Sequence, residues 1–164
     1  MKFIDPHHDL WQHAVGEDGP KPDPDPAPHR LLSLEQWHAV RGHWPADVPV
    51  AIEFPNDADI AQLVPDLNRI ALVVLDFPKW TDGRAYSQAR LLRARYRFAG
   101  AIRARGEVLV DMLQLLHRTG FDEAQLRGDQ SQEAARRALA FFAEGFYQGD
   151  VHEARPAYLR TAAR

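Results

Sequence analysis

Short apolar runs alternate with helix-periodic segments along most of the chain. Strand-like runs occupy 48–54, 70–77, 101–105 and 124–127, with a further candidate at 31–34. Helix-like patterns follow them at 35–41, 58–67, 85–97 and 107–118, and a last one reaches 147. Because crossovers between parallel strands are nearly always right-handed, four consecutive strand–helix units predict an α/β fold with a parallel sheet. Both a small layered sheet and half of a (βα)8-type barrel fit this order.

Cap residues and the chain ends set the boundaries of this pattern. Asn56 and Asp57 are expected to cap the helix after 48–54, and Gly120 is expected to end the helix at 107–118. Asp129 or Ser131 is expected to cap the last helix. The predicted organisation is an extended N-terminal segment and proline-rich connector at 1–29, a single α/β domain at 30–147 and a flexible tail at 148–164.

Composition narrows the class of protein. The 164 residues are 45% hydrophobic, so one domain can bury a core. A net charge of −3 gives no indication of nucleic-acid binding, and no run approaches the roughly 20 apolar residues of a membrane span. The absence of cysteine excludes thiol catalysis, redox disulfides and thiolate-held metal clusters. With no signal-peptide pattern at the start, we expect a cytoplasmic location.

The loop after 70–77 carries the strongest candidate site. In α/β folds, ligands bind in the loops that follow the carboxyl ends of the strands. A glycine turn beside cationic side chains and a helix start can hold an oxyanion. The predicted anion-binding residues are Asp76, Lys79, Trp80, Thr81, Asp82, Gly83, Arg84 and Arg127. In the alternative interpretation, Asp82 only caps the helix and Arg84 is solvated.

The next helix is dense in arginine and has no acidic residue. Tyr86, Arg90, Arg93 and Arg97 recur at helical spacing and predict one exposed stripe that docks an acidic protein surface. A merely solvated face is the alternative. At the strand ends, Glu53, Asp76, Arg103, Arg105 and Arg127 are expected to share one edge of the sheet, where they bind a small anion or pair with each other.

The N-terminus offers a weaker hypothesis. The stretch Phe3-Ile-Asp-Pro-His-His-Asp-Leu-Trp11 resembles the first strand of metal-dependent amidohydrolases, which implies metal ligands at Asp5, His7 and Asp9. No further histidine ligands follow at later strand ends, so we expect no metal site and a segment packed on the domain surface. Dinucleotide loops, P-loops and nucleophile elbows are all missing from the sequence, and no cofactor is expected.

Two segments resemble a bacterial family, the domain of unknown function 934. They are FPKWTDGRAYSQARLL at 77–92 and RTGFD at 118–122, supported by LLSLEQW at 31–37 and PNDAD at 55–59. The resemblance spans 30–147. Members of the family are labelled probable oxidoreductases involved in sulfite reduction, which implies an association with sulfite reductase.

Three hypotheses follow. The first is a non-catalytic accessory protein that docks on sulfite reductase or another sulfate-assimilation enzyme, or binds a small sulfur oxyanion. The second is a small enzyme or anion sensor at the strand ends, with Asp76 as general base. The third is a metal-dependent hydrolase using Asp5, His7 and Asp9. Whether the chain is an enzyme stays open, and a half-barrel could complete itself as a homodimer.

Overall fold

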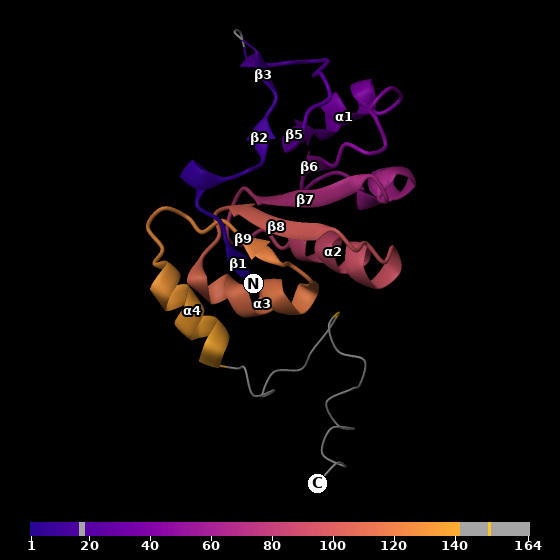
Figure 1. Cartoon of the computed structure of the whole chain (residues 1–164). Helices are drawn as coiled ribbons and strands as arrows, with labels where there is room; N and C mark the ends of the chain where they lie inside the picture. Colours follow the sequence, from indigo (N-terminus) through magenta and orange to yellow (C-terminus); the bar gives the residue numbers. More distant parts are fainter. Residues whose placement is uncertain (17–18, 142–150, 152–164) are drawn as a thin grey trace.

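The computed structural model describes residues 1–16, 19–141 and 151, and within them seven parallel strands form one sheet (Figure 1). The strands are β1 (Lys2–Phe3), β2 (Gln12–His13), β5 (Arg30–Ser33), β6 (Val50–Phe54), β7 (Ile70–Phe77), β8 (Ala101–Gly106) and β9 (Glu123–Ala124). Their spatial order is β1-β9-β8-β7-β6-β5-β2. A short antiparallel pair, β3 (Val15–Gly16) with β4 (Gly19–Pro20), lies outside this sheet.

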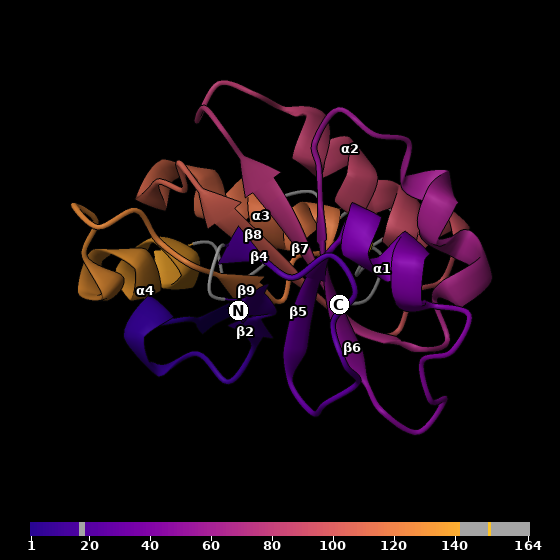
Figure 2. The ribbon, with the colours of Figure 1, turned by 90° about the horizontal axis from the view of Figure 1, so that it is seen from above.

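The order of the strands identifies the architecture as a half-barrel. Strands β5 to β9 are neighbours in chain order, and right-handed crossovers between such strands place the connecting helices on one face. Figure 2 shows these helices in an arc along that face, with the N-terminal segment on the other side. The predicted parallel α/β fold is therefore confirmed. Of the two arrangements that the sequence allowed, the structure has the half-barrel.

The helical elements follow the predicted order with several local differences. After the N-terminal 3₁₀ turn η1 (Pro6–His8), they are α1 (Leu34–Val40), η2 (Ile60–Asp66), α2 (Arg84–Arg90), the π-helical η3 (Leu91–Arg95), η4 (Val110–Met112), α3 (Leu113–Thr119) and α4 (Gln132–Phe141). The predicted α-helix at 58–67 is instead a 3₁₀ helix, capped by Asp59 and not by Asn56 or Asp57. Strand β9 is shorter than predicted and begins one residue earlier.

The predicted helix ends are mostly found. Gly120 ends α3 with a φ of 106°, in the left-handed region where a glycine is favoured. Ser131 caps α4, because its hydroxyl accepts the Ala134 amide, whereas the Asp129 carboxylate binds Arg127. Residues 142–147 of the predicted last helix, and the predicted tail except residue 151, lie outside the described residues.

The main core lies between the sheet and the helices. Side chains at alternate strand positions point to this side, among them Ile52, Phe54 and Phe77, as the period of two requires. Trp37 of α1 is fully buried and donates its indole N–H to Asp66 over 3.0 Å. This polar contact satisfies the indole donor within an otherwise apolar layer.

The N-terminal segment crosses the concave face of the half-barrel. Strand β1 pairs with β9 at one edge and β2 pairs with β5 at the other, so the residues between them span the sheet (Figure 1). Trp11 packs on a second apolar cluster, which consists of Leu31, Ala51, Leu72 and Val74. The sequence analysis predicted that this segment packs on the domain surface. In the structure, the segment supplies both edge strands of the sheet and covers its concave face.

The proline-rich part is held by one side chain of α1. The Gln36 amide donates to the carbonyl oxygens of Ala14 and Lys21, over 3.1 Å and 2.7 Å. Ala14 and Pro24 are buried. Because prolines cannot donate backbone hydrogen bonds, a side-chain amide from the body of the fold anchors the backbone here.

Replacing Trp11 tests whether the N-terminal segment is part of the folded core. Trp11→Ala should lower the free energy of unfolding by roughly 2 kcal/mol, below the 3–5 kcal/mol of a fully buried tryptophan. Leu10→Ala is the matched control, since Leu10 is 66% exposed and its loss should cost less than about 0.5 kcal/mol. Urea unfolding measures both. Equal, small effects of the two substitutions would show that the segment is not docked.

Candidate functional site

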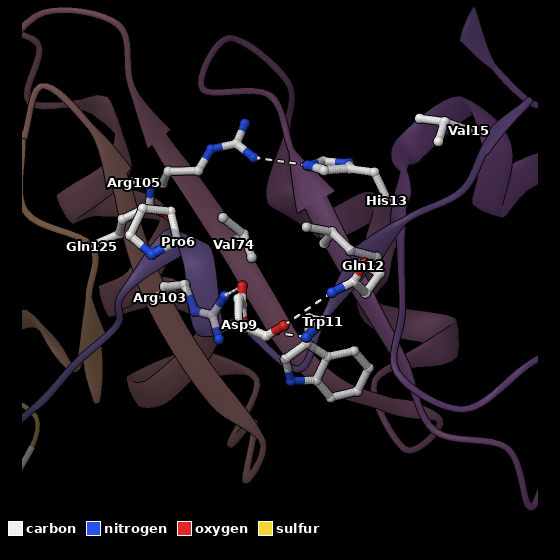
Figure 3. Close-up of a pocket in the computed structure, with 11 residues that line it drawn as sticks. Pro6, Asp9, Trp11, Gln12, His13, Val15, Val74, Arg103, Arg105 and Gln125 are labelled. Atoms are coloured by element: carbon white, nitrogen blue, oxygen red, sulfur yellow. Dashed lines mark hydrogen bonds and ion pairs between the residues drawn. The ribbon is translucent and has the colours of Figure 1, made fainter. Parts of the chain in front are cut away.

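A cavity of about 390 Å³ lies between the N-terminal segment and the concave face of the sheet (Figure 3). Its polar lining comes from Asp9, Gln12, His13, Arg103, Arg105 and Gln125, and its apolar lining from Pro6, Trp11, Val15, Leu31 and Val74. Alternation along the strands explains this arrangement. Val74 and Asp76 on β7, and Arg103 and Arg105 on β8, point away from the helices because their neighbours fill the main core.

Arg103 forms the buried base of this cluster. The side chain is only 3% exposed, and its guanidinium pairs with Asp9 from the N-terminal segment and with Glu123 from β9, the latter over 2.8 Å. A buried cation needs such partners, because an uncompensated charge in the interior is strongly destabilising. Both partners are present, so Arg103 links the N-terminal segment to the sheet.

Arg105 lies nearer the carboxyl ends of the strands and is more accessible. Its guanidinium pairs with Glu53 of β6 and approaches Asp76 of β7 at 3.7 Å. The ring of His13 lies 3.3 Å from the same guanidinium and 3.6 Å from the Glu53 carboxylate. The Arg105 side chain is 25% exposed. It is therefore a cation held in place by carboxylates yet within reach of a ligand.

Burial raises the pKa of Asp76, and the neighbouring Glu53 charge raises it further, while Arg105 opposes both effects. The carboxyl group thus sits where its ionised form is disfavoured. Groups with shifted pKa values are common at functional sites, although structural ion pairs also produce them.

A second cavity, of about 440 Å³, adjoins the Glu53–Arg105 pair at the ends of β5, β6 and β7. It is lined by Ser33, Leu34, Glu35, Glu53, Phe54, Pro55, Asn56, Asp76 and Pro78. Glu53 and Asp76 face this cavity, whereas Arg105 lines the first one. The ion pair therefore lies between a carboxylate-lined cavity and an arginine-lined cavity.

In the predicted anion-binding loop, the acidic side chain and one of the basic side chains pair with each other. Asp82 accepts hydrogen bonds from the Arg84 side chain and backbone and from Asn56, and these contacts lower the pKa of Asp82 to about 2. Gly83 has a φ of −86°, outside the left-handed region. Lys79, Trp80 and Thr81 are exposed. Because the Asp82 carboxylate forms a salt bridge with the Arg84 guanidinium, the positive charge of Arg84 is compensated within the loop.

The predicted arginine stripe is not continuous. Arg93 is mostly buried and donates to the carbonyl oxygens of Phe98, Gly100 and Gly120 as well as to Asp122. Tyr86 is half-buried against two phenylalanine rings, 5.0 Å and 6.4 Å away.

The rest of the stripe loses its helical alignment. The α-helix changes to a π-helix at Leu91, and Arg97 has a φ of 55°, so the spacing expected for one α-helix does not hold. Arg90 and Arg97 are exposed. A docking role for the four residues stays a prediction.

Arg127 and the predicted metal ligands near the N-terminus have other partners. Arg127 pairs with Glu107 and Asp129, and these contacts raise its pKa. Asp5 accepts from the His7 amide and pairs with the His8 ring over 2.8 Å, whereas Asp9 pairs with Arg103. Within the described residues, no group of three or more acidic or histidine side chains is placed to hold a metal ion.

The sequence predicted five strand-end groups that would bind an anion or pair with each other: Glu53, Asp76, Arg103, Arg105 and Arg127. Arg127 instead pairs with Glu107 and Asp129, away from the other four. The structure pairs Arg105 with Glu53 and Asp76 on the concave side, and Arg103 lines the same cavity as Arg105. The prediction from the sequence did not include three polar residues of the cavity lining, which are Gln12, His13 and Gln125. Gln125 could have been found from the alternation that follows β9, but His13 could not, because a two-residue strand has no periodicity.

Fold and cavity together define a parallel half-barrel protein with a ligand-sized cavity on the concave face of its sheet. Residues 51–158 match the family described as Bacterial protein of unknown function (DUF934), and the chain belongs to that family. The resemblance seen in the sequence is thereby confirmed. No curated protein matches the sequence. Among the described helices, none has the length and apolar character needed to cross a membrane.

The raised pKa of Asp76 predicts a pH-dependent stability. A carboxyl whose folded-state pKa is raised contributes stability that is complete below its unfolded-state pKa and is lost as pH rises through the folded value. Because asparagine does not ionise, the Asp76→Asn variant does not undergo this pH-dependent loss of stability. The stability of the variant relative to the native protein should therefore increase from acidic to neutral pH, as measured by urea unfolding across that range.

Asp129→Asn is the control of opposite sign. Arg127 lowers the pKa of Asp129 to about 2, so the stability from Asp129 is present above the usual carboxyl range and is lost as pH falls toward about 2. This variant should become relatively less stable as pH rises. If the Asp76→Asn difference stayed flat or followed the Asp129→Asn trend, the description of Asp76 would be wrong.

Proposed function

We propose that this protein is an accessory protein of sulfite reduction that binds a small oxyanion in the arginine-lined cavity. The family resemblance implies the sulfur chemistry, and Arg105 is the observation that supports the site. Arg105 is partly exposed, lies beside His13 and lines the cavity near the carboxyl end of β8. In (βα)8-type folds, ligands bind on the carboxyl-end side of the strands.

The side chains that line this cavity include two arginines, Arg103 and Arg105. Among the described lining residues, Asp9 is the only carboxylate, and it is paired with Arg103. Arg105, Gln12 and Gln125 add hydrogen-bond donors. Planar guanidinium groups bind oxyanions through paired N–H donors. Glu53 and Asp76 hold Arg105 from the side of the second cavity, so the guanidinium is oriented before a ligand arrives.

The sequence favours an accessory role over that of an electron carrier. Without cysteine, the chain has no thiol to cycle between redox states or to hold an iron–sulfur cluster. Binding and delivery of an anion need only the side chains present at the cavity.

Arg105→Gln should weaken binding of sulfite or sulfate by about 10- to 100-fold, since a charge-assisted hydrogen bond contributes about 1.5–3 kcal/mol. Titration calorimetry measures the affinity, and a thermal melt checks folding. Arg127→Gln is the matched control, because Arg127 also follows a strand but lies outside the cavity. Loss of binding in Arg127→Gln, or in neither variant, would contradict the assignment.

Docking on sulfite reductase is a second candidate, motivated by Trp80. This side chain is 58% exposed in the loop after β7, and exposed tryptophans are frequent centres of protein interfaces. Tagged protein should recover sulfite reductase from a native extract, and Trp80→Ala should abolish the recovery. Leu10→Ala, at a similarly exposed position, should not. Recovery that is equal in both variants would exclude the Trp80 surface.

A further inference from the structure

We infer that the arginine-lined cavity takes an organic anion, with one oxyanion head group and an apolar body of a few carbons, in preference to a bare inorganic oxyanion. This inference rests on the proposed function and specifies the class of ligand. The volume of the cavity favours an organic ligand. The cavity volume of about 390 Å³ lies within the roughly 300–1,000 Å³ range of pockets for organic ligands, whereas one water occupies about 30 Å³. A bare oxyanion would leave most of this space to water.

Two polar groups of the cavity are concentrated on one side. Arg105 and His13 lie together on one side of the cavity, and Val74 lies between them and Trp11 (Figure 3). Leu31 and Val74 continue the apolar cluster beneath Trp11. A ligand whose head group reaches Arg105 would therefore place its remaining atoms against apolar side chains.

Arg103, the other arginine of the cavity, is not available to bind a second anionic group of a ligand. Arg103 is 3% exposed and already pairs with Asp9 and Glu123, so its charge is compensated by the protein. Arg105 also has carboxylate neighbours, but it is more exposed and one of its terminal nitrogens faces His13. The cavity thus offers one accessible cationic position, which matches a ligand with a single anionic end.

The experiment compares ligands that share a head group and differ in their apolar part. Affinities of the native chain for sulfate, methanesulfonate, propanesulfonate and butanesulfonate are measured by calorimetry, with acetate to pentanoate as a second head-group series. Each added methylene that is buried should tighten binding about threefold to fourfold. The terminal disulfonate of butane should bind no more tightly than butanesulfonate.

Val15→Ser tests the apolar wall without disturbing the core, because Val15 lines the cavity but is 67% exposed. It should reduce the gain per methylene more than it reduces sulfate binding. Val64→Ser is the control on a distant exposed valine, 40% exposed on η2. It should change neither quantity.

The outcomes separate this inference from the proposed function. Sulfate binding that depends on Arg105, with no gain along either series, would overturn the organic ligand and leave the oxyanion site standing. No binding of any anion would overturn both. Gains that persist in Arg105→Gln would also overturn the inference, because the apolar body would then bind without the head-group contact.

Discussion

The buried ion pairs of Arg103 tie the N-terminal segment to the sheet. A cation that is 3% exposed on the concave side of a half-barrel needs carboxylates, and one of them, Asp9, comes from a segment 94 residues earlier in the chain. This pairing holds the N-terminal segment across the sheet. Trp11 and the short strands β1 and β2 complete the attachment at the apolar cluster and at both edges.

The cavity is a consequence of that attachment. A half-barrel leaves one face of its sheet without helices, and the N-terminal segment covers this face only in part. On the sheet side, the cavity is lined by the side chains of β7 and β8 that alternate away from the helices. On the opposite side, it is lined by Gln12 and His13 of the N-terminal segment. Arg105 is kept in position by Glu53 and Asp76, so the accessible cation is oriented by the same strands that form the wall.

Much of the fold was predictable because β6, β7 and β8 are long enough to show apolar runs, and the predicted parallel sheet follows from their spacing. The grouping of Glu53, Asp76 and Arg105 followed from the shared carboxyl edge of parallel strands. The role of residues 1–13 was not predictable. Two-residue strands carry no periodic signal, and proline-rich sequence gives no indication that a glutamine side chain will hold it.

The contacts of Arg93 and Arg84 were also not predictable from the sequence. Helical spacing predicted that Arg93 would face outward, but three carbonyl oxygens and Asp122 bind its guanidinium after the helix changes to a π-helix. Likewise, the sequence could not show that Asp82 compensates Arg84. Charge counted along a sequence does not reveal which cations stay accessible, because that depends on contacts formed only in the folded chain.

The most direct test of the central claim is a crystal structure of the protein soaked in selenate, with the anion located by its anomalous signal. We predict a selenium peak in the cavity beneath the N-terminal segment, within hydrogen-bonding distance of Arg105 and His13. A peak at Lys79 and Arg84 instead, with none beside Arg105, would contradict it and return the site to the loop after β7.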